Sequence, residues 1–381
     1  MVRADGGTVS DGLHKKIPHL ANAGRGIHRT GGAMDDALKA PFPWFGGKSR
    51  AAPLIWPRFG DVANYVEPFF GSGAVLLARP HAPRIETVND FDGFLANFWR
   101  AIAADPEGVA AAADWPVNET DLHARHRWLV NRVDFRARML ADPDYFDVKI
   151  AGWWVWGLCA WIGSGWCSAA PGGEVSEQMP AVDTGAHGGT SLRGVHSKAM
   201  RGPSTQIPKL SPGGASGGGN GMQGIHGLNT RSRILETFQA LSARLRGVRV
   251  ACGDFERILS DSVTWRHGTT AILLDPPYAD GEEVYSAGDD APGTFARAAA
   301  WAAEHGSDKR LRIALCGYEG TWSPPAGWST IAWKAKGGYG GQRGEGKAKN
   351  ENAGRERIWC SPGCLRADDA VNAGPLFAGL P

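Results

Sequence analysis

The sequence predicts an α/β fold built on a mostly parallel, doubly wound sheet. Short β-prone segments alternate with segments of helical apolar spacing, before residue 104 and again after residue 230, which is the pattern of repeated strand, helix, strand units. Glycines follow the first predicted strand and acids follow the next three. Polar groups therefore gather at the carboxyl ends of the strands, where open α/β sheets bind ligands.

Composition sets the limits of this prediction. The chain has 381 residues and is 43% hydrophobic, enough for a sizeable core. The net charge is only +2, so any basic surface for nucleic acid must be local. No apolar run approaches the ~20 residues of a membrane span, and the amino terminus lacks the apolar core of a signal peptide. We therefore expect a cytoplasmic protein.

The six cysteines are scattered and mostly within apolar stretches, as is typical of reduced, buried thiols. Cys360 and Cys364 are accompanied by neither a second cysteine pair nor a histidine cluster, so no metal site is predicted.

Residues 1–40 are polar and aperiodic, which predicts a disordered tail. Residues 41–50 then form an aromatic-flanked Gly-Gly turn that contains Trp44 and delivers Lys48 and Arg50. A surface turn with solvated cations is the plain alternative.

Residues 64–78 read as a short strand, a glycine-containing loop with Gly71 and Gly73, and a helix. Glycines let the backbone approach a ligand, and a helix start offers unpaired N–H groups. Neither G-x-G-x-x-G nor G-x-x-x-x-G-K-[ST] occurs here, which disfavours a dinucleotide or a triphosphate. A second strand over 85–90 ends in Asp90, an acid that either reaches ribose hydroxyls or is simply solvated. The next helix, 93–103, has the spacing of a core helix.

The character changes from about residue 115. Residues 121–138 read as one helix rich in arginine with interleaved aromatic residues. Such density belongs either to a solvated face or to contacts with a phosphate backbone. Residues 153–166 hold five tryptophans, mostly core, with one or two as a stacking platform in the sharper interpretation. Residues 172–227 are rich in Gly, Ser and Pro, which predicts a long mobile loop.

Regular alternation resumes at residue 230. A helix over 232–245 is followed by a strand into Asp254 and Phe255, a further helix, and the buried strand 272–274. That strand runs into Asp275, Pro276, Pro277 and Tyr278, whose prolines end it and hold an acid and a ring on a stiff turn. Such a turn alone is also an ordinary strand exit. Further strands are predicted over 311–316, 330–333 and 357–360.

Four of these parts, in this order, resemble the Dam-type, D12 class N6-adenine-specific DNA methyltransferases. The sequence P-F-P-W-F-G-G-K at 41–48 precedes F-F-G-S-G at 69–73, and an insertion precedes D-P-P-Y at 275–278. The resemblance covers roughly residues 41–365. It implies a Rossmann-like class I methyltransferase sheet over 41–114 and 230–365, a target-recognition insertion with the Gly-rich loop over 115–229, and a tail over 366–381.

The resemblance also implies roles for individual residues. S-adenosylmethionine would be bound by Trp44, Lys48, Phe69, Gly71, Ser72, Gly73, Asp90, Asp254 and Phe255. Catalysis would fall to Asp275, Pro276, Pro277 and Tyr278, and double-stranded DNA would meet Arg125, Arg127, Arg132 and Arg136. The enzyme would act as a monomer in the cytoplasm of a bacterial or phage-infected cell, without a metal.

The residues suit this chemistry. An exocyclic adenine nitrogen is a poor nucleophile because its lone pair is delocalised into the ring. If the Asp275 carboxylate and the Pro276 carbonyl accept its two hydrogens, the nitrogen regains that lone pair, and the proline-fixed turn keeps both acceptors in place beforehand. A base inside a duplex is out of reach, so it must be flipped out, and Tyr278 would stack on it.

Two alternatives remain. One is methylation of RNA or of a protein glutamine amide, because a planar NH₂ group poses the same problem; the glutamine enzymes favour Asn where this chain has Asp275. The other is a DNA-binding protein without catalysis, which the intact Lys48, Gly71, Asp275 and Tyr278 disfavour.

Overall fold

The structure is a computed structural model that describes residues 38–44, 46–161, 166–167, 224–228, 231–277, 293–334 and 354–366. All of them lie in one compact unit that runs from Ala37 to Pro381. The predicted N-terminal tail up to residue 37, most of the Gly-rich segment 172–227, Tyr278 and the C-terminal tail from residue 367 lie outside the described residues.

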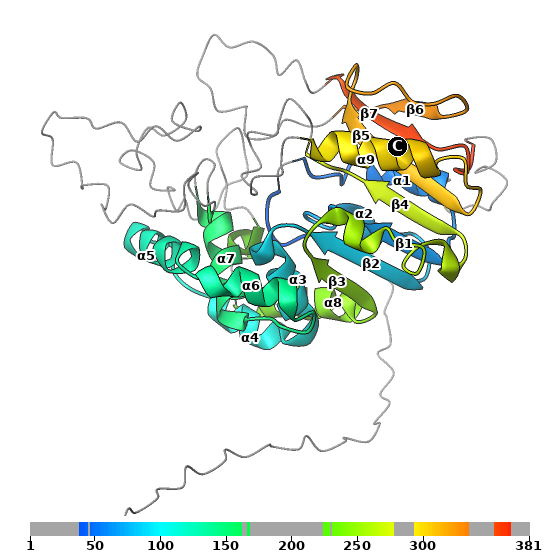
Figure 1. The fold of residues 1–381 in the computed structure, drawn as a ribbon. Coiled ribbons are helices and arrows are strands. Elements are labelled where there is room, and N and C mark those ends of the chain that lie inside the picture. The colour runs from blue at the N-terminus through cyan, green and yellow to red at the C-terminus, as the bar shows by residue number, and fades with distance from the viewer. Residues whose placement is uncertain are drawn as a thin grey trace, which may run out of the picture. The chain divides into compact units, whose positions relative to one another are not determined.

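The helices and strands alternate largely as the sequence predicts (Figure 1). In chain order they are α1 (Ala52–Phe59), β1 (Asn64–Glu67), α2 (Ala74–Leu77), β2 (Ile85–Asp90), α3 (Gly93–Ala104), α4 (Pro106–Ala113), α5 (Glu119–Val130), α6 (Val133–Ala141), α7 (Val148–Ala160), the 3-10 helix η2 (Gly224–Leu228), α8 (Arg231–Leu245), β3 (Val248–Cys252), the 3-10 helices η3 (Phe255–Ile258) and η4 (Trp265–His267), β4 (Thr270–Leu274), α9 (Thr294–His305), β5 (Leu311–Tyr318), β6 (Ser329–Ala332) and β7 (Glu356–Cys360).

Within the described residues, seven strands form one sheet in the order β3-β2-β1-β4-β5-β7-β6. Strands β3, β2, β1, β4 and β5 pair in parallel, whereas β7 runs antiparallel to both β5 and β6. The chain reverses its direction across the sheet between β1 and β4, which are neighbours although β2 and β3 intervene in sequence. The prediction of a mostly parallel, Rossmann-like α/β sheet is confirmed.

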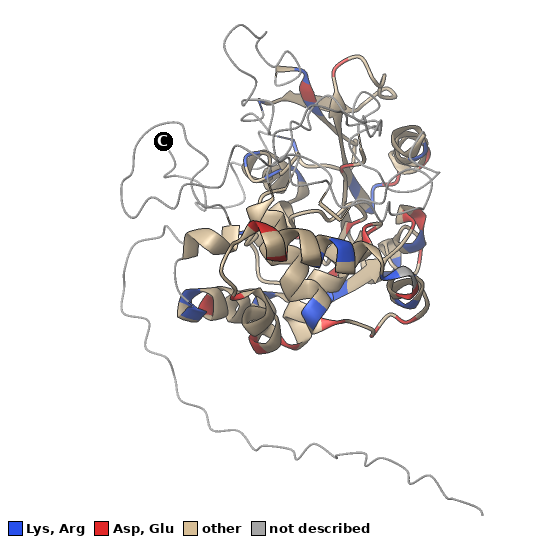
Figure 2. Cartoon of the chain, turned by 90° about the vertical axis from the view of Figure 1, so that its left-hand side faces the viewer, with Lys and Arg blue, Asp and Glu red and all other residues tan. Residues whose placement is uncertain are grey.

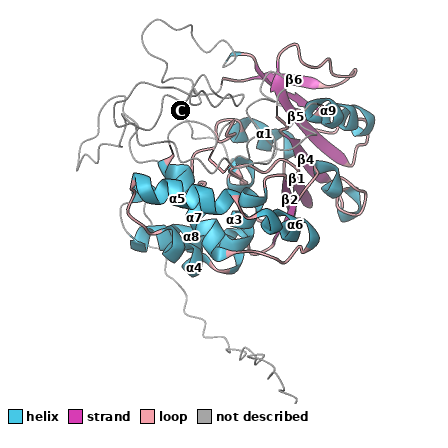
Figure 3. Ribbon diagram, turned by 60° about the vertical axis from the view of Figure 1, so that its left-hand side comes forward, coloured by secondary structure: helices cyan, strands magenta, loops and turns pink. Residues whose placement is uncertain are grey.

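Strand β4 shows why the sheet needs helices on both faces, since all five of its residues are buried. Ala271 and Leu273 join a core with helices α1, α3 and α8, while Ile272 and Leu274 join a second core with α9. Successive side chains of a strand point to opposite faces, so a strand covered on both faces reads as a continuous apolar run. Figure 3 shows α3, α7 and α8 on one side of the strands and α9 on the other.

The helices after β2 extend the first core. Asp92 caps α3 by accepting hydrogen bonds from the backbone N–H groups of Phe94 (2.8 Å) and Leu95 (3.3 Å). The predicted core positions of α3 are buried, and Trp154 and Trp156 of α7 belong to the same cluster. The start of the predicted insertion therefore shares its core with the sheet-covering helices. Most tryptophans of 153–166 are core, as predicted.

The single helix predicted over 121–138 is wrong, because the chain forms α5 and α6 with a break at Asn131 and Arg132. Leu129 and Phe135 are both buried. Residues six apart on one straight helix project about 120° apart around its axis, so a continuous helix would not place both on the same face. The break lets Phe135 stack on Phe94 of α3, with ring centroids 5.2 Å apart.

The helix predicted after Phe255 is also shorter than expected, since only the 3-10 turns η3 and η4 form. Between them Thr264 turns its hydroxyl back onto the Ser260 carbonyl at 2.9 Å. Ser and Thr side chains that bond nearby backbone compete with helix formation in this way. No helix in the described ranges combines the length and apolar character needed to cross a bilayer.

Candidate active site

The sheet brings the predicted site residues to one edge. Strands β3, β2, β1 and β4 are consecutive neighbours and parallel, so their carboxyl ends lie side by side. These ends lead into Asp254, Asp90, the glycine loop after Glu67, and Asp275 respectively. Residues scattered over more than half of the chain thus meet at the ligand-binding edge of an open α/β sheet.

The glycine loop is held from two directions through Gly71. Its backbone N–H donates to Asp90 Oδ2 at 2.9 Å, and its carbonyl accepts from Trp99 Nε1 at 3.0 Å. Asp90 ends β2 and Trp99 lies on α3, so two elements fix the two peptide groups that flank Gly71. The loop has a defined shape before any ligand arrives.

Only glycine fits at positions 71 and 73. Their φ angles are 49° and 64°, in the left-handed region that L side chains avoid. A Cβ on Gly71 would lie 2.7 Å from Trp44 Nε1, and one on Gly73 would lie 2.7 Å from the Phe70 ring. Trp44 therefore packs directly on the loop, while Ser72 between the two glycines is buried.

The carboxyl group of Asp90 is half-buried and accepts hydrogen bonds from the backbone. Besides Gly71, it accepts a hydrogen bond from the Asp92 backbone N–H, on Oδ1 at 2.9 Å. Burial raises the pKa of Asp90 to about 7, although the backbone N–H groups of Gly71, Asp92 and Phe91 favour its ionised form. Each oxygen uses one acceptor position and keeps another, so the group can still receive two hydroxyl donors.

Asn89, one residue earlier, was not singled out from the sequence and ties three strand ends together. The Asn89 side-chain Nδ2 donates to the Pro68 carbonyl (3.1 Å) and the Gly253 carbonyl (2.9 Å), and the Asn89 backbone carbonyl accepts from Phe70 N–H (2.9 Å). The amide is fully buried. It braces the loops after β1 and β3 against the end of β2.

Glu67 is the second residue that sequence reasoning missed. It is the last residue of β1, is only 3% exposed, and accepts a hydrogen bond from the Tyr65 hydroxyl at 2.9 Å. Burial raises its pKa well above the ordinary value, and the charges of Asp275 and Asp90 raise it further. Its position in the sequence could have identified it, because Glu67 ends a strand of the sheet just as Asp90 does.

Asp254 and Phe255 stand at the end of β3 with Arg297 of α9. Arg297 Nη2 lies 3.0 Å from Asp254 Oδ2 and 2.8 Å from Glu256 Oε1, and its guanidinium sits 4.9 Å from the Phe255 ring centroid. The rings of Phe255 and Phe69 pack at 5.1 Å. Phe255 is buried while Phe69 is partly exposed, so Phe69 offers the more accessible face of the pair.

The acid that follows β4 forms an ion pair. Lys48 Nζ lies 2.8 Å from Asp275 Oδ1, and the two side chains are 5% and 19% exposed. The predicted turn 41–48 therefore reaches the end of β4. Pro276 after Asp275 is buried and Pro277 is partly exposed. Tyr278, predicted to stack on a base, lies outside the described residues.

The predicted DNA-contacting arginines divide into two groups. Arg125 is only 7% exposed and is enclosed by Trp115, Trp153 and Trp156, with the nearest ring centroid 4.2 Å from its guanidinium. Its Nη1 has no hydrogen-bond partner in the described structure. Such a buried cation does not suit a phosphate contact.

The other three arginines are exposed. Arg132 lies over Trp128 with its guanidinium 3.8 Å from the ring centroid, and Arg136 lies over Phe91 at 4.6 Å. Together with Arg127 they come from α5, the break after it and α6, whose charged residues are coloured in Figure 2.

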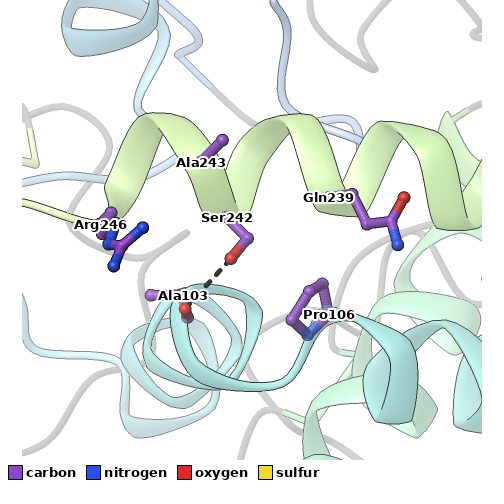
Figure 4. Close-up of a pocket in the computed structure, with 6 residues that line it drawn as sticks. All are labelled: Ala103, Pro106, Gln239, Ser242, Ala243 and Arg246. Carbon is purple, nitrogen blue, oxygen red and sulfur yellow. Dashed lines mark hydrogen bonds between the residues drawn. The ribbon is translucent and has the colours of Figure 1, made fainter. Parts of the chain in front are cut away.

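A separate hollow lies between the carboxyl end of α3 and α8 (Figure 4). Ser242 donates to the Ala103 carbonyl there at 3.1 Å, and Arg246 lies at one end. None of the predicted site residues lines it. Among the described residues, no group of three or more His, Cys, Asp or Glu side chains is arranged to hold a metal ion.

Comparison with protein-family models finds a match over part of the chain. Residues 44–145 match the model of the D12 class N6 adenine-specific DNA methyltransferases. No curated protein matches the chain. The matched stretch contains the turn with Lys48, the glycine loop, Asp90 and helices α5 and α6, and it ends before β3 and β4.

Proposed function

Because the chain carries a D12 class N6 adenine-specific DNA methyltransferase domain over residues 44–145, we propose that it transfers a methyl group from S-adenosylmethionine to the exocyclic N6 of a flipped adenine in double-stranded DNA. The family supports adenine methylation of DNA in general. The donor, the flipped base and the residue roles below are our proposal.

One observation carries this proposal. Asp275 leaves β4 directly beside β1, whose end opens into the preformed glycine loop. A substrate group held by Asp275 and a cofactor held by the loop would therefore be neighbours at one sheet edge. Proximity of two reactants in a fixed geometry is itself a large part of catalysis.

The residues present fit S-adenosylmethionine. Asp90 retains acceptor positions for ribose hydroxyls, and Glu67 offers a carboxyl group for the ammonium of the methionine portion. Phe69 presents a partly exposed ring for the adenine, with Asp254 and Phe255 next to it. When bound, this cofactor supplies a methyl group on a positively charged sulfur, which departs as a neutral thioether.

The chain's own groups prepare the nucleophile. The Asp275 carboxylate and the Pro276 carbonyl accept hydrogen bonds from the two N6 hydrogens, which withdraws the lone pair from the ring and directs it outward. After the N–C bond has formed, the nitrogen carries one proton too many. Asp275 is the nearest base and receives it for release to water.

Binding of DNA would involve the exposed arginines Arg127, Arg132 and Arg136. Flat aromatic partners hold Arg132 and Arg136 extended along the surface, which leaves their N–H groups available for phosphate oxygens. We leave Arg125 out of this set because of its burial. The division into a catalytic part, 41–114 with 230–365, and a target-recognition insertion, 115–229, stays a prediction, as do the monomeric state and the cytoplasmic location.

The full chain is tested with tritium-labelled S-adenosylmethionine and equal masses of mixed-sequence duplex DNA, RNA and cell protein, the DNA coming from a host without adenine methylation. We expect label in DNA, recovered after digestion as N6-methyldeoxyadenosine. Label only in RNA or protein would favour the alternative substrates. Binding to DNA without any transfer would favour an inactive DNA-binding protein.

Asp275→Asn keeps the shape of the side chain and removes its charge, so transfer should fall by about 10²-fold or more while cofactor binding persists. Asp261→Asn, at an exposed position between η3 and η4, is the matched control and should keep full activity. Full activity of the Asp275 variant would show that the catalytic assignment is wrong.

A further inference from the structure

The family resemblance implies that Lys48 binds the cofactor. The structure instead pairs Lys48 with the carboxylate of Asp275. In the structure its Nζ lies 2.8 Å from Asp275 Oδ1 and also donates to the Gly46 carbonyl at 2.9 Å. The amine is thus held between the early turn and the end of β4.

Trp333, which follows β6, packs on the same amine. Lys48 Nζ lies 5.6 Å from the centroid of that ring, and both side chains are buried. A cation near an aromatic face is attracted by the ring's electron-rich surface. Three separate segments therefore fix the position of this one charge, which a solvated surface lysine would not require.

Lys48 stays charged in this environment. Burial lowers the pKa of Lys48 more than any single neighbour raises it, but the charges of Asp275, Cys316 and Glu356 and the hydrogen bond to Asp275 together outweigh burial, so the pKa is raised. An amine of this kind neither gives up nor accepts a proton near neutral pH. It can act only as a fixed positive charge and a hydrogen-bond donor.

The other groups around Asp275 act in the opposite sense. Glu67 of β1 and Asp275 repel each other when both are ionised, and Cys316 of β5 and Glu356 of β7 belong to the same electrostatic cluster. Glu67 and Cys316 have raised pKa values because of burial, and they add no positive charge. Lys48 is therefore the cation that lies against the Asp275 carboxylate among the described residues of this cluster.

We infer that Lys48 is a positioning residue that keeps Asp275 ionised and fixes the orientation of its carboxylate for the substrate amine. This inference rests on the proposed function and deepens it. A protonated Asp275 would lose its capacity to accept one N6 hydrogen, because its own proton would occupy an acceptor position. Lys48 uses one acceptor position on Oδ1, and a carboxylate has about four.

The decisive variant is Lys48→Met, which keeps an unbranched stem and removes the charge. Lys48→Arg restores the charge, and Lys309→Met, at an exposed position, is the matched control. For each protein we would measure kcat and KM for tritium-labelled S-adenosylmethionine on mixed-sequence duplex DNA from pH 6 to 9. Calorimetry without DNA would measure cofactor binding separately.

In Lys48→Met, we expect kcat at neutral pH to fall by about 10²-fold. The acidic limb of the kcat profile should move upward by about 1 to 3 pH units, the effect of losing a neighbouring opposite charge. Cofactor affinity should change by less than about threefold, and Lys48→Arg should return the limb towards its wild-type position. An unmoved limb together with weakened cofactor binding would overturn the inference, since Lys48 would then serve the cofactor.

Thermal unfolding tests the pair without any activity. Without Lys48, folded Asp275 would hold its proton more tightly than in the unfolded chain, so the variant would lose stability as pH rises above about 4. The difference in Tm between wild type and Lys48→Met should therefore widen from pH 5 to 8, whereas Lys309→Met should show a constant difference. A constant difference for Lys48→Met would contradict the inference. If the wild type transfers no label to DNA, the proposed function fails, and this measurement still decides on the pair.

Discussion

Replacing Gly71 by alanine tests whether the glycine loop is built as described. The φ angle of 49° places an alanine in the left-handed region, at a cost of roughly 1–2 kcal/mol. Its Cβ would lie 2.7 Å from Trp44 Nε1, so the Trp44 ring must move, and overpacking of this kind costs typically about 1–3 kcal/mol. The two effects together predict a loss of about 2–5 kcal/mol in the free energy of unfolding.

Thermal unfolding and calorimetric titration with S-adenosylmethionine measure the outcome. At roughly 2–4 °C per kcal/mol, Gly71→Ala should lower the Tm by about 4–20 °C and weaken cofactor binding. Gly247→Ala is the matched control, because a Cβ at Gly247 meets nothing within 4 Å. Adding Trp44→Leu should recover the part of the loss that comes from the clash and leave the backbone part. A Gly71→Ala protein as stable and as tight in binding as the wild type would refute the reasoning.

Three further predictions concern charged groups. Asp90, with a pKa of about 7, is mostly neutral at pH 6 and mostly ionised at pH 8. Calorimetry should therefore show that S-adenosylmethionine binds about tenfold more tightly at pH 8 than at pH 6. Asp90→Asn should abolish this pH dependence. Because folded Asp90 holds its proton more tightly than the unfolded chain, its contribution to stability falls as pH rises from about 4 to 7. Replacing Arg127 and Arg132 by alanine should reduce the slope of log K against log salt by about 0.9 per lost phosphate contact, whereas Arg125→Met should lower the Tm and leave the slope unchanged. Arg244→Met should lower the free energy of unfolding by about 1.5–3 kcal/mol, because buried Glu86 would lose the guanidinium that lies 2.6 Å from its Oε2 and would keep that of Arg79.

The fold was largely predictable because its signals are local. The apolar run before Asp275 and the alternation around Asp90 mark strands buried in a sheet, and the structure has them at those positions. The order of the strands then brings the acids together. The positions of these strands and acids follow from local residue patterns and not from any side-chain contact.

The hydrogen bonds and ion pairs within the site were not predictable, because they join residues distant in sequence. Asn89 bonds the carbonyl of Gly253, and Lys48 pairs with Asp275, without a local pattern that marks either contact. Arg125 was predicted to contact DNA, although long-range packing buries it. Its neighbours in sequence resemble a basic surface, and only the folding of α7 against α5 encloses it among tryptophans.

The two indole rings that contact Gly71 make the glycine loop observable by spectroscopy. Trp99 donates its ring N–H to the Gly71 carbonyl, and the Trp44 ring packs on the same residue. Any displacement of the loop alters the surroundings of both chromophores at once. The chain holds 16 tryptophans, so bulk emission would dilute their response, but fluorine-labelled tryptophan gives each indole its own NMR line. Two assignable resonances would then report directly on the state of the glycine loop.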